Sequence, residues 1–426
     1  MSRFKLLVIL GVVASHPMLA MAQSSVNSTP EERSAEIARW IAELDSDRFA
    51  VRNAAARNLL EAGETAIPYL ADDTRHATLE ATWRVVQILT IHCRHGSPRA
   101  SASALDALEK LASSSNPITA RRAALALDEH RTYCHRQAVA ALRKLGAHVA
   151  DQGDQSPEVR LDNRWRGEDD DLAHLRQLRG LRMISVSNSA VSDAGLEHIA
   201  GAKDVERLFL GESRIRGPGL RHVANLANLS YLSLRELSID DKSVGHLAGM
   251  TQLEHLGLDD TPIGDAALAH VGRLENLQTL WLNRTRVTDE GLAQLRPLKN
   301  LNKLYLSGVR LNGSGLVHLE ELPNLRYLSL QYAPLTDESL AYIKGLTQLD
   351  SLGLDDTQVT DAGMANLRSL VNLERLWLTN TQVGDDAIPH LRMLGNLKRL
   401  DIQGCKFSEQ GLADLRLALP DCRIIH

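Results

Sequence analysis

Residues 277–300 read LQTLWLNRTRVTDEGLAQLRPLKN, and this stretch decides the fold. Its first half has the pattern Leu-x-x-Leu-x-Leu, formed by Leu277, Leu280 and Leu282. Such alternation predicts a strand with one buried face. Its second half spaces further leucines as on a helix, at Leu292, Leu295 and Leu298. This spacing gives a short helix one apolar stripe, so the unit is predicted to be a strand followed by a helix.

The same pattern recurs with a strict period of 24 residues, in ten units from Leu181 to Pro420. A single unit cannot enclose its own apolar face, so neighbouring units must stack. Stacking predicts an α/β solenoid with a parallel sheet on its concave side and helices on its convex side. The strict period supports this fold, because a slip of one residue would turn the core side chains of a strand outward.

Three polar columns follow the same period. Asp289, just ahead of the helical leucines, is predicted to cap the free N–H groups of its own helix. A small, mostly hydroxylic column is predicted to form a hydrogen-bonded ladder after the strands, and its members are Ser189, Ser213, Thr261, Thr285, Thr357, Thr381 and Cys405. An amide column is predicted to satisfy backbone groups before the next strand, and its members are Asn228, Asn276, Asn300, Asn324, Asn372 and Asn396.

A second period of 96 residues, equal to four units, relates residues 229–324 to residues 325–420. The sequence LGLDDT occurs at 256–261 and again at 352–357, and LWL occurs at 280–282 and 376–378. Two interpretations stay open: duplication of a block without functional meaning, or duplication of a feature with a function.

The first residues predict export. Arg3 and Lys5 precede the apolar run Leu6–Ala14, and residues 20–22 offer a small-x-small cleavage site. This pattern is typical of a signal peptide, here residues 1–22, and an uncleaved anchor is the alternative. Removal of two positive charges would take the net charge from -5 to -7. We expect a secreted or periplasmic protein of the cell envelope, with no integral membrane segment after cleavage.

The rest of the chain divides into further segments. After a linker at 23–33, residues 34–150 show helical spacing and predict a small all-α, HEAT-like domain of helix pairs. Residues 151–180 are predicted to form a junction and N-terminal cap, with a strand at 159–161, because the first repeat would otherwise expose its core. Residues 181–420 hold the ten repeats, and residues 421–426 are expected to form a closing strand.

The repeat unit resembles that of bacterial secreted leucine-rich-repeat proteins of the ribonuclease-inhibitor-like, 24-residue class. The closing segment Ala418–Ile424 resembles that group too, as do the stretches FAVR at 49–52 and ETAIP at 64–68. The resemblance implies a leucine-rich-repeat solenoid that binds a ligand with its concave face or edges and needs no cofactor. The sequence departs from the pattern at Ile239–His246, where Lys242-Ser243-Val244 replaces x-Gly-Leu and leaves the local helix geometry open.

Motifs for catalysis are absent from the sequence, which has no Gly-x-Ser-x-Gly, His-Glu-x-x-His, Gly-x-Gly-x-x-Gly or phosphate loop. We therefore expect a protein that is not an enzyme and holds neither a cofactor nor a metal. No basic face dominates at a net charge of -5, which argues against nucleic acid as a partner.

Several polar groups have a functional and a structural interpretation. A histidine column is expected to be a partly exposed feature of the convex helices, with metal binding or pH sensing as its alternative; its members are His198, His222, His246, His270, His318 and His390. The pairs Asp259-Asp260 and Asp355-Asp356 offer too few carboxylates for calcium, so solvated rims are expected.

The four cysteines could form two pairs, and one aromatic residue lies in the segment between the two predicted domains. Export permits a disulfide between Cys93 and Cys134, which we expect in preference to a zinc site with nearby histidines or two free thiols. A bridge between Cys405 and Cys422 is doubtful on distance. The segment Arg164–Arg166 is expected to pack as a linker, and docking of an acidic partner is its alternative.

Six of the nine aromatic residues in 181–426 fall on outward strand positions, where folding does not need them. These candidate binding residues are Phe209, Tyr231, Trp281, Tyr305, Tyr327 and Trp377, flanked by Arg207, Lys303, Arg375 and Arg399. Exposed aromatics at such sites usually anchor a partner. The predicted function is a non-enzymatic scaffold that binds a protein or peptide on the concave face. A carbohydrate-binding or structural envelope module is the alternative, with polysaccharide as its ligand.

Overall fold

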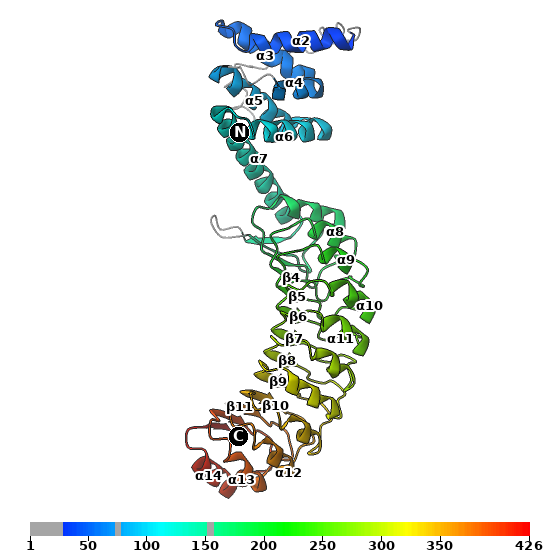
Figure 1. Ribbon diagram of the computed structural model, residues 1–426, viewed down its shortest axis with the longest axis vertical. Helices are drawn as coiled ribbons and strands as arrows, with labels where there is room; N and C mark the ends of the chain where they lie inside the picture. The colour runs from blue at the N-terminus through cyan, green and yellow to red at the C-terminus, as the bar shows by residue number, and fades with distance from the viewer. Residues whose placement is uncertain (1–28, 73–77, 151–156) are drawn as a thin grey trace. The chain divides into compact units, whose positions relative to one another are not determined.

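The computed structural model describes residues 29–72, 78–150 and 157–426. The predicted signal peptide at 1–22 and most of the linker lie outside these described residues. The chain divides into two compact units between Arg136 and Gln137. Figure 1 shows helices in the first unit and a row of strands with helices in the second. Within the described residues, no helix is both long and apolar enough to cross a membrane.

The N-terminal unit is built from α-helices: α2 (Pro30–Glu43), α3 (Phe49–Ala62), α4 (Ile67–Asp72), α5 (Leu79–His95), α6 (Pro98–Ala112) and the first part of α7 (Pro117–Lys144). Helix α2 packs on α3, and α5 packs on α6. Helices α2 and α6 begin at side-chain caps: Thr29 forms a capping box with Glu32, and Ser97 accepts a hydrogen bond from the Ala100 N–H before α6. The predicted helical N-terminal region is confirmed, although residues 148–150, the end of its predicted range, form a strand of the second unit.

The second unit contains one sheet of thirteen strands in sequence order. Strand β1 (His148–Ala150) pairs antiparallel with β2 (Glu158–Arg160), and every later pair is parallel. The remaining strands are β3 (Met183–Ser185), β4 (Arg207–Phe209), β5 (Tyr231–Ser233), β6 (His255–Gly257), β7 (Thr279–Trp281), β8 (Lys303–Tyr305), β9 (Tyr327–Ser329), β10 (Ser351–Gly353), β11 (Arg375–Trp377), β12 (Arg399–Asp401) and β13 (Arg423–Ile425). The predicted leucine-rich-repeat solenoid is confirmed; β2 precedes its first repeat and β13 follows its last.

The central residue of each strand points into the core. Leu280 pairs with Leu256 on one side and Leu304 on the other, and all three side chains are fully buried. Partners from β3 to β13 lie 24 residues apart, so the strand leucines form continuous rows. The predicted linker residue Trp165 is also buried in this core, which agrees with a packing role for the Arg164–Arg166 segment.

The second half of each unit forms short helical segments, some α-helical and some 3₁₀-helical. These elements are η3 (Asp169–Gln177), α8 (Gly195–Ile199), α9 (Leu220–Val223), α10 (Asp241–Val244), η4 (Gly245–Leu247), α11 (Asp265–Val271), η5 (Gly291–Leu295), η6 (Ser314–Glu321), η7 (Ser339–Ile343), α12 (Asp361–Met364), η8 (Ala365–Leu367), η9 (Asp385–Ala387), α13 (Ile388–Leu391) and α14 (Glu409–Ala418), where η marks a 3₁₀-helix. Leu292 and Leu295 lie on η5 three residues apart, which is the period of a 3₁₀-helix, whereas Leu268 and Val271 at the same spacing lie on α11.

The predicted helix cap at Asp289 is wrong. Its carboxylate instead accepts hydrogen bonds from three backbone N–H groups of the following repeat, those of Asn312 at 2.7 Å, Gly313 at 3.0 Å and Gly315 at 2.8 Å. Asp193 also accepts from three backbone N–H groups of its next repeat, and one such bond each is made by Asp241, Asp265, Asp337, Asp361 and Asp385. The aspartate column therefore joins repeats to one another.

The departure at Lys242-Ser243-Val244 is explained by the same column. A side chain on Gly315 would lie 2.2 Å from the backbone of Asp289, so this position needs glycine, whereas Asp241 and Asp361 have alanine at the equivalent position, Ala267 and Ala387. Gly217 and Gly313 replace the aspartate in two repeats, and there Ser243 and Ser339 stand where the opposing glycine would be. The exchange keeps the space filled, and α10 forms normally with Asp240 as its N-cap.

Replacing Asp289 by alanine is expected to lower the free energy of unfolding by about 3 kcal/mol, because three backbone N–H groups lose a charged acceptor. Urea denaturation of the full chain would measure the loss. The exposed neighbour Glu290 supplies the control, since Glu290→Ala should change stability by less than about 0.5 kcal/mol. Equal stability of the two variants would refute a joining role for the aspartate column.

The two other polar columns are partly corrected. Each hydroxyl of the Ser/Thr column donates to a carbonyl three residues earlier in its own repeat, as Thr285 does to Leu282 at 2.7 Å, and a contact along the column from one repeat to the next occurs where Cys405 lies against Thr381. The asparagine column does bond across repeats: Asn300 Nδ2 donates to the Glu275 carbonyl at 3.0 Å. Its predicted role in satisfying backbone groups is confirmed.

Candidate functional site

The candidate site is a row of rings on the outward face of the sheet, which we call the aromatic ridge. Each three-residue strand has an inward central leucine and two outward neighbours. The first outward position holds Tyr231, His255 and Tyr327, and the second holds Phe209, Trp281, Tyr305 and Trp377. The ridge runs from β4 to β11. His255 was missed in the sequence, although it shares the register of Tyr231.

The rings of the ridge contact one another in sequence. Trp281 and Tyr305 stack with centroids 5.5 Å apart and an interplanar angle of 16°. The ring centroids of Tyr305 and Tyr327 lie 4.8 Å apart. At the other end, the ring of Phe209 lies 4.9 Å from that of Tyr231, and the ring of Tyr231 lies 5.6 Å from that of His255.

Contact between rings reduces their exposure. All six predicted aromatics are half-buried, where full exposure was expected. The cover comes from neighbouring rings, and the leucines behind them are already fully buried. The ridge thus presents ring faces and edges to solvent in a fixed arrangement. Side chains that are already ordered lose little conformational entropy when a ligand binds to them.

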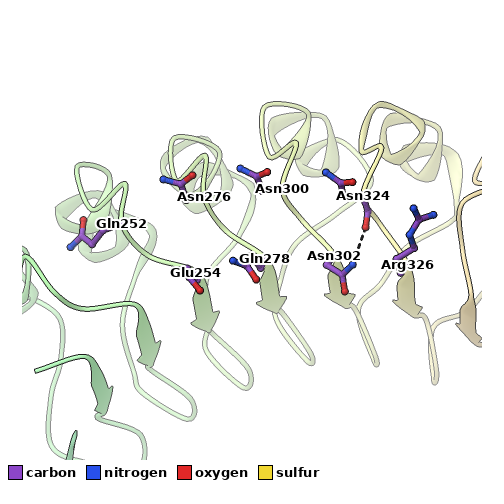
Figure 2. A pocket seen from close by; sticks show the side chains of 8 residues that line it. All are labelled: Gln252, Glu254, Asn276, Gln278, Asn300, Asn302, Asn324 and Arg326. Carbon is purple, nitrogen blue, oxygen red and sulfur yellow. Dashed lines mark hydrogen bonds between the residues drawn. The ribbon is translucent and has the colours of Figure 1, made fainter. Parts of the chain in front are cut away.

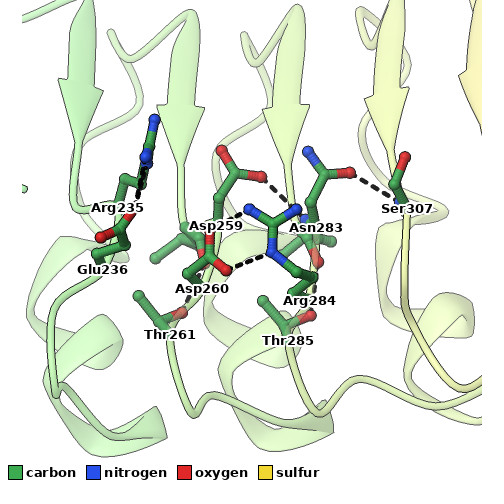
Figure 3. Close-up of polar contacts among 11 residues, drawn as sticks. Arg235, Glu236, Asp259, Asp260, Thr261, Asn283, Arg284, Thr285 and Ser307 are labelled. Atoms are coloured by element: carbon green, nitrogen blue, oxygen red, sulfur yellow. Dashed lines mark hydrogen bonds and ion pairs between the residues drawn. The ribbon is translucent and has the colours of Figure 1, made fainter. Parts of the chain in front are cut away.

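A third outward position, two residues beyond each strand, carries a polar row beside the ridge (Figure 3). Asp259 Oδ1 accepts from the Asn283 N–H at 2.9 Å, and Asn283 Oδ1 accepts from the Ser307 N–H at 2.7 Å. Farther along, the Asp355 carboxylate accepts from the Thr379 N–H at 2.7 Å and from the Gln331 amide. The row holds the two aspartates in place against the ridge.

The expectation of solvated rims is wrong for the first aspartate of each pair, half-buried Asp259 and buried Asp355, whereas Asp356 is exposed as expected. Burial raises the pKa of Asp259 and of Asp355, and only 8% of Asp355 is exposed. Burial also raises the pKa of Tyr231 and Tyr305, with the Asp259 charge as a second cause. A carboxyl pKa raised by folding means that the free energy of unfolding falls as pH rises from the unfolded pKa to the folded one. Both charges therefore cost stability at neutral pH.

The second aspartate of each pair has a different environment. Asp260 lies in the left-handed turn after β6 with φ 57° and forms an ion pair with Arg284 (Figure 3). Asp356 occupies the same kind of turn with φ 56°. The described residues include no group of three histidine, cysteine or carboxylate side chains placed to hold a metal ion.

The predicted basic residues lie at the first outward position. Arg207 contacts Glu158 at 2.9 Å, Arg375 contacts Asp350 at 3.2 Å and Arg399 contacts Asp401 at 3.6 Å. Lys303 forms no ion pair with any described residue. Three of the four predicted cations are thus largely neutralised, and Lys303 remains available beside Tyr305.

Amides line a groove at the edge where the chain enters the strands (Figure 2). Its eight lining residues are Gln252, Glu254, Asn276, Gln278, Asn300, Asn302, Asn324 and Arg326. Several amides already serve the fold, since Asn276 and Asn324 each donate to a backbone carbonyl at 2.9 Å. The groove is therefore mainly a consequence of the asparagine column.

The other sequence candidates do not gather into a site. The histidines of the convex column bond different partners, as His198 does with Asp170 and His390 with Arg368. The expected disulfide is absent, because Cys93 and Cys134 are free thiols and the Cys134 Sγ lies 3.4 Å from the His130 ring on its own helix. Burial raises the pKa of Cys93 to about 11, so its thiol is protonated at neutral pH. Cys405 and Cys422 are free as well.

Comparison with known proteins gives likeness in fold only. No family model and no curated protein matches the sequence. Among solved structures, an internalin from Listeria monocytogenes is 20% identical with a TM-score of 0.42, over 60% of this chain and 82% of that one. A leucine-rich-repeat protein from Leptospira interrogans is 19% identical with a TM-score of 0.38, over 60% and 80%. A plant peptide hormone receptor in complex with RGF2 is 18% identical with a TM-score of 0.39, over 59% and 44%.

Proposed function

We propose that this protein is a non-enzymatic scaffold that binds a protein or peptide on the concave face of its solenoid. One observation carries the proposal: seven rings from Phe209 to Trp377 form a continuous outward ridge over leucines that are already buried. Outward rings add nothing to closure of the core, and half-buried aromatics in fixed positions are the groups that dominate binding energy at interfaces. The binding residues are the six predicted aromatics with His255 and Lys303.

Polysaccharide is the competing ligand, because rings on a sheet also stack on sugars. The negative charges of the polar row distinguish between a charged peptide and a neutral sugar. Asp259 and Asp355 place buried negative charge against the rings, which favours a ligand with positive charge over a neutral sugar.

The proposal is tested by immobilising the full chain and passing over it an extract of the cells that make it. A polypeptide retained by the wild-type chain and released by free chain supports the proposal. Retention of polysaccharide alone, measured on the same column, would overturn it in favour of the sugar-binding alternative.

The proposed location is outside the cytoplasm, in the periplasm or beyond, and it follows from the signal pattern. Intact-mass measurement of the protein from its native host should give a chain that begins at Gln23, because cleavage after Ala22 removes the n-region and the apolar run. A soluble chain that retains Met1 would contradict export by this signal.

A further inference from the structure

The 96-residue period repeats one arrangement of four residues within the ridge. In the first copy, Tyr231 and Trp281 lean toward each other over Gly257, with centroids 6.0 Å apart and an interplanar angle of 53°. In the second copy, Tyr327 and Trp377 lie 6.1 Å apart at 59°, on either side of β10 with Gly353. Asp259 and Asp355 follow the two glycines by two residues. We call these arrangements the first and second acid–aromatic motifs.

The motifs are kept although their surroundings change. Between the copies His255 becomes Ser351, Arg235 becomes Gln331 and Tyr305 becomes Asp401. Other repeats of the same solenoid fold without the arrangement, since β8 carries Lys303 and Tyr305 with Ser307 in the third position. The fold therefore does not require it. A shared requirement at the two sites explains why the ring pair, the glycine and the carboxylate are retained together.

The chemistry of each motif fits a cation. Asp259 Oδ1 is taken by a neutral N–H group, and the nearby guanidinium of Arg284 pairs with Asp260. Asp355 is likewise held by two neutral donors, from Thr379 and Gln331; its charged neighbour Asp401 adds negative charge and is contacted by Arg399. A half-buried carboxylate beside aromatic faces attracts an ammonium or guanidinium through charge and cation–π contact.

The spacing of the motifs indicates how such cations are arranged. The carboxylates follow β6 and β10, four strands apart, which corresponds to roughly 19 Å at the usual strand separation. An extended peptide advances roughly 3.3 Å per residue, so roughly six residues span that distance, and an even number returns the side chain to the same face. Lys303 on β8 lies midway between the motifs and disfavours a third cation there.

We propose that the two acid–aromatic motifs each accept one lysine or arginine side chain, so that the concave face binds an extended peptide segment with two basic residues six positions apart. This inference rests on the proposed peptide-binding function and names the ligand chemistry of that site. The two motifs act together, because the second contact forms within an already bound peptide.

The test uses the full chain and short synthetic serine–glycine peptides with a fluorescent label, read by anisotropy. The peptide with two lysines six positions apart should bind about tenfold or more tightly than one with a single lysine or with lysines three positions apart. Asp259→Asn and Asp355→Asn keep the hydrogen-bond acceptor for the N–H group and should each lower the affinity of the two-lysine peptide to the single-lysine value.

The matched control is Asp260→Asn, which removes a neighbouring carboxylate that is ion-paired with Arg284 and should leave the affinity within about twofold, as an exposed ion pair contributes little. Equal affinity of all peptides, or no effect of Asp259→Asn and Asp355→Asn, would overturn the inference. If the partner retained from cell extract still binds both aspartate variants but not Trp281→Ala, the cation inference fails and the scaffold function stands. If that partner also binds Trp281→Ala unchanged, the scaffold function itself fails.

Discussion

Replacing Trp281 by alanine is expected to weaken binding of the partner by about 30-fold, or 2 kcal/mol, the effect of removing an interface hot spot. Trp281 stacks on Tyr305 and also contacts Tyr231 and His255, so it lies where both halves of the ridge meet. Its loss removes a large ring surface and opens the first acid–aromatic motif. Titration of wild-type and variant chains with the isolated partner measures the change.

The stability of the same variant serves as its control. Trp281→Ala is expected to lower the free energy of unfolding by about 1–2 kcal/mol, because the ring is half-buried and contacts other rings. A substitution at a fully exposed position would lower it by less. A variant that binds like the wild type and melts far lower would show that the ridge is packing.

Leu280→Ala should behave in the opposite way and lower the free energy of unfolding by about 2–5 kcal/mol. The side chain is fully buried between Leu256 and Leu304, and neighbouring repeats on both sides would have to close the cavity. Thermal and urea denaturation followed by circular dichroism measure the loss. Lys303→Ala, a change at an exposed position of the next strand, should stay within about 0.5 kcal/mol. If Leu280→Ala unfolds with the wild-type midpoint, Leu280 does not belong to the core row.

The strand rows were predictable because burial imposes a strict pattern. A 24-residue period with inward leucines allows one register, and that register places Trp281 and Tyr305 side by side on adjacent strands. The six aromatics of the ridge could be identified for the same reason, since an outward position in such a strand has no role in the core.

Contacts between repeats were harder to predict, because one sequence position has several partners in space. The sequence predicts Asp289 as a helix cap in its own unit, yet its carboxylate accepts hydrogen bonds from backbone N–H groups of the next repeat. Asp259 was expected to be a solvated rim, yet it is half-buried and burial raises its pKa. His255 is not counted among aromatic residues, and only its register with Tyr231 reveals it. The 3₁₀-helices were missed because the three-residue spacing of the leucines was interpreted as that of an α-helix.

The most direct test of the central claim compares the wild-type chain with a Trp281→Ala/Tyr305→Ala double variant in capture from the extract of its own cells. Both rings lie outside the core rows, and circular dichroism would first establish that the double variant is folded. The account predicts that one polypeptide is retained by the wild-type chain and lost from the folded double variant. Retention of the same polypeptide by both chains would contradict binding at the aromatic ridge.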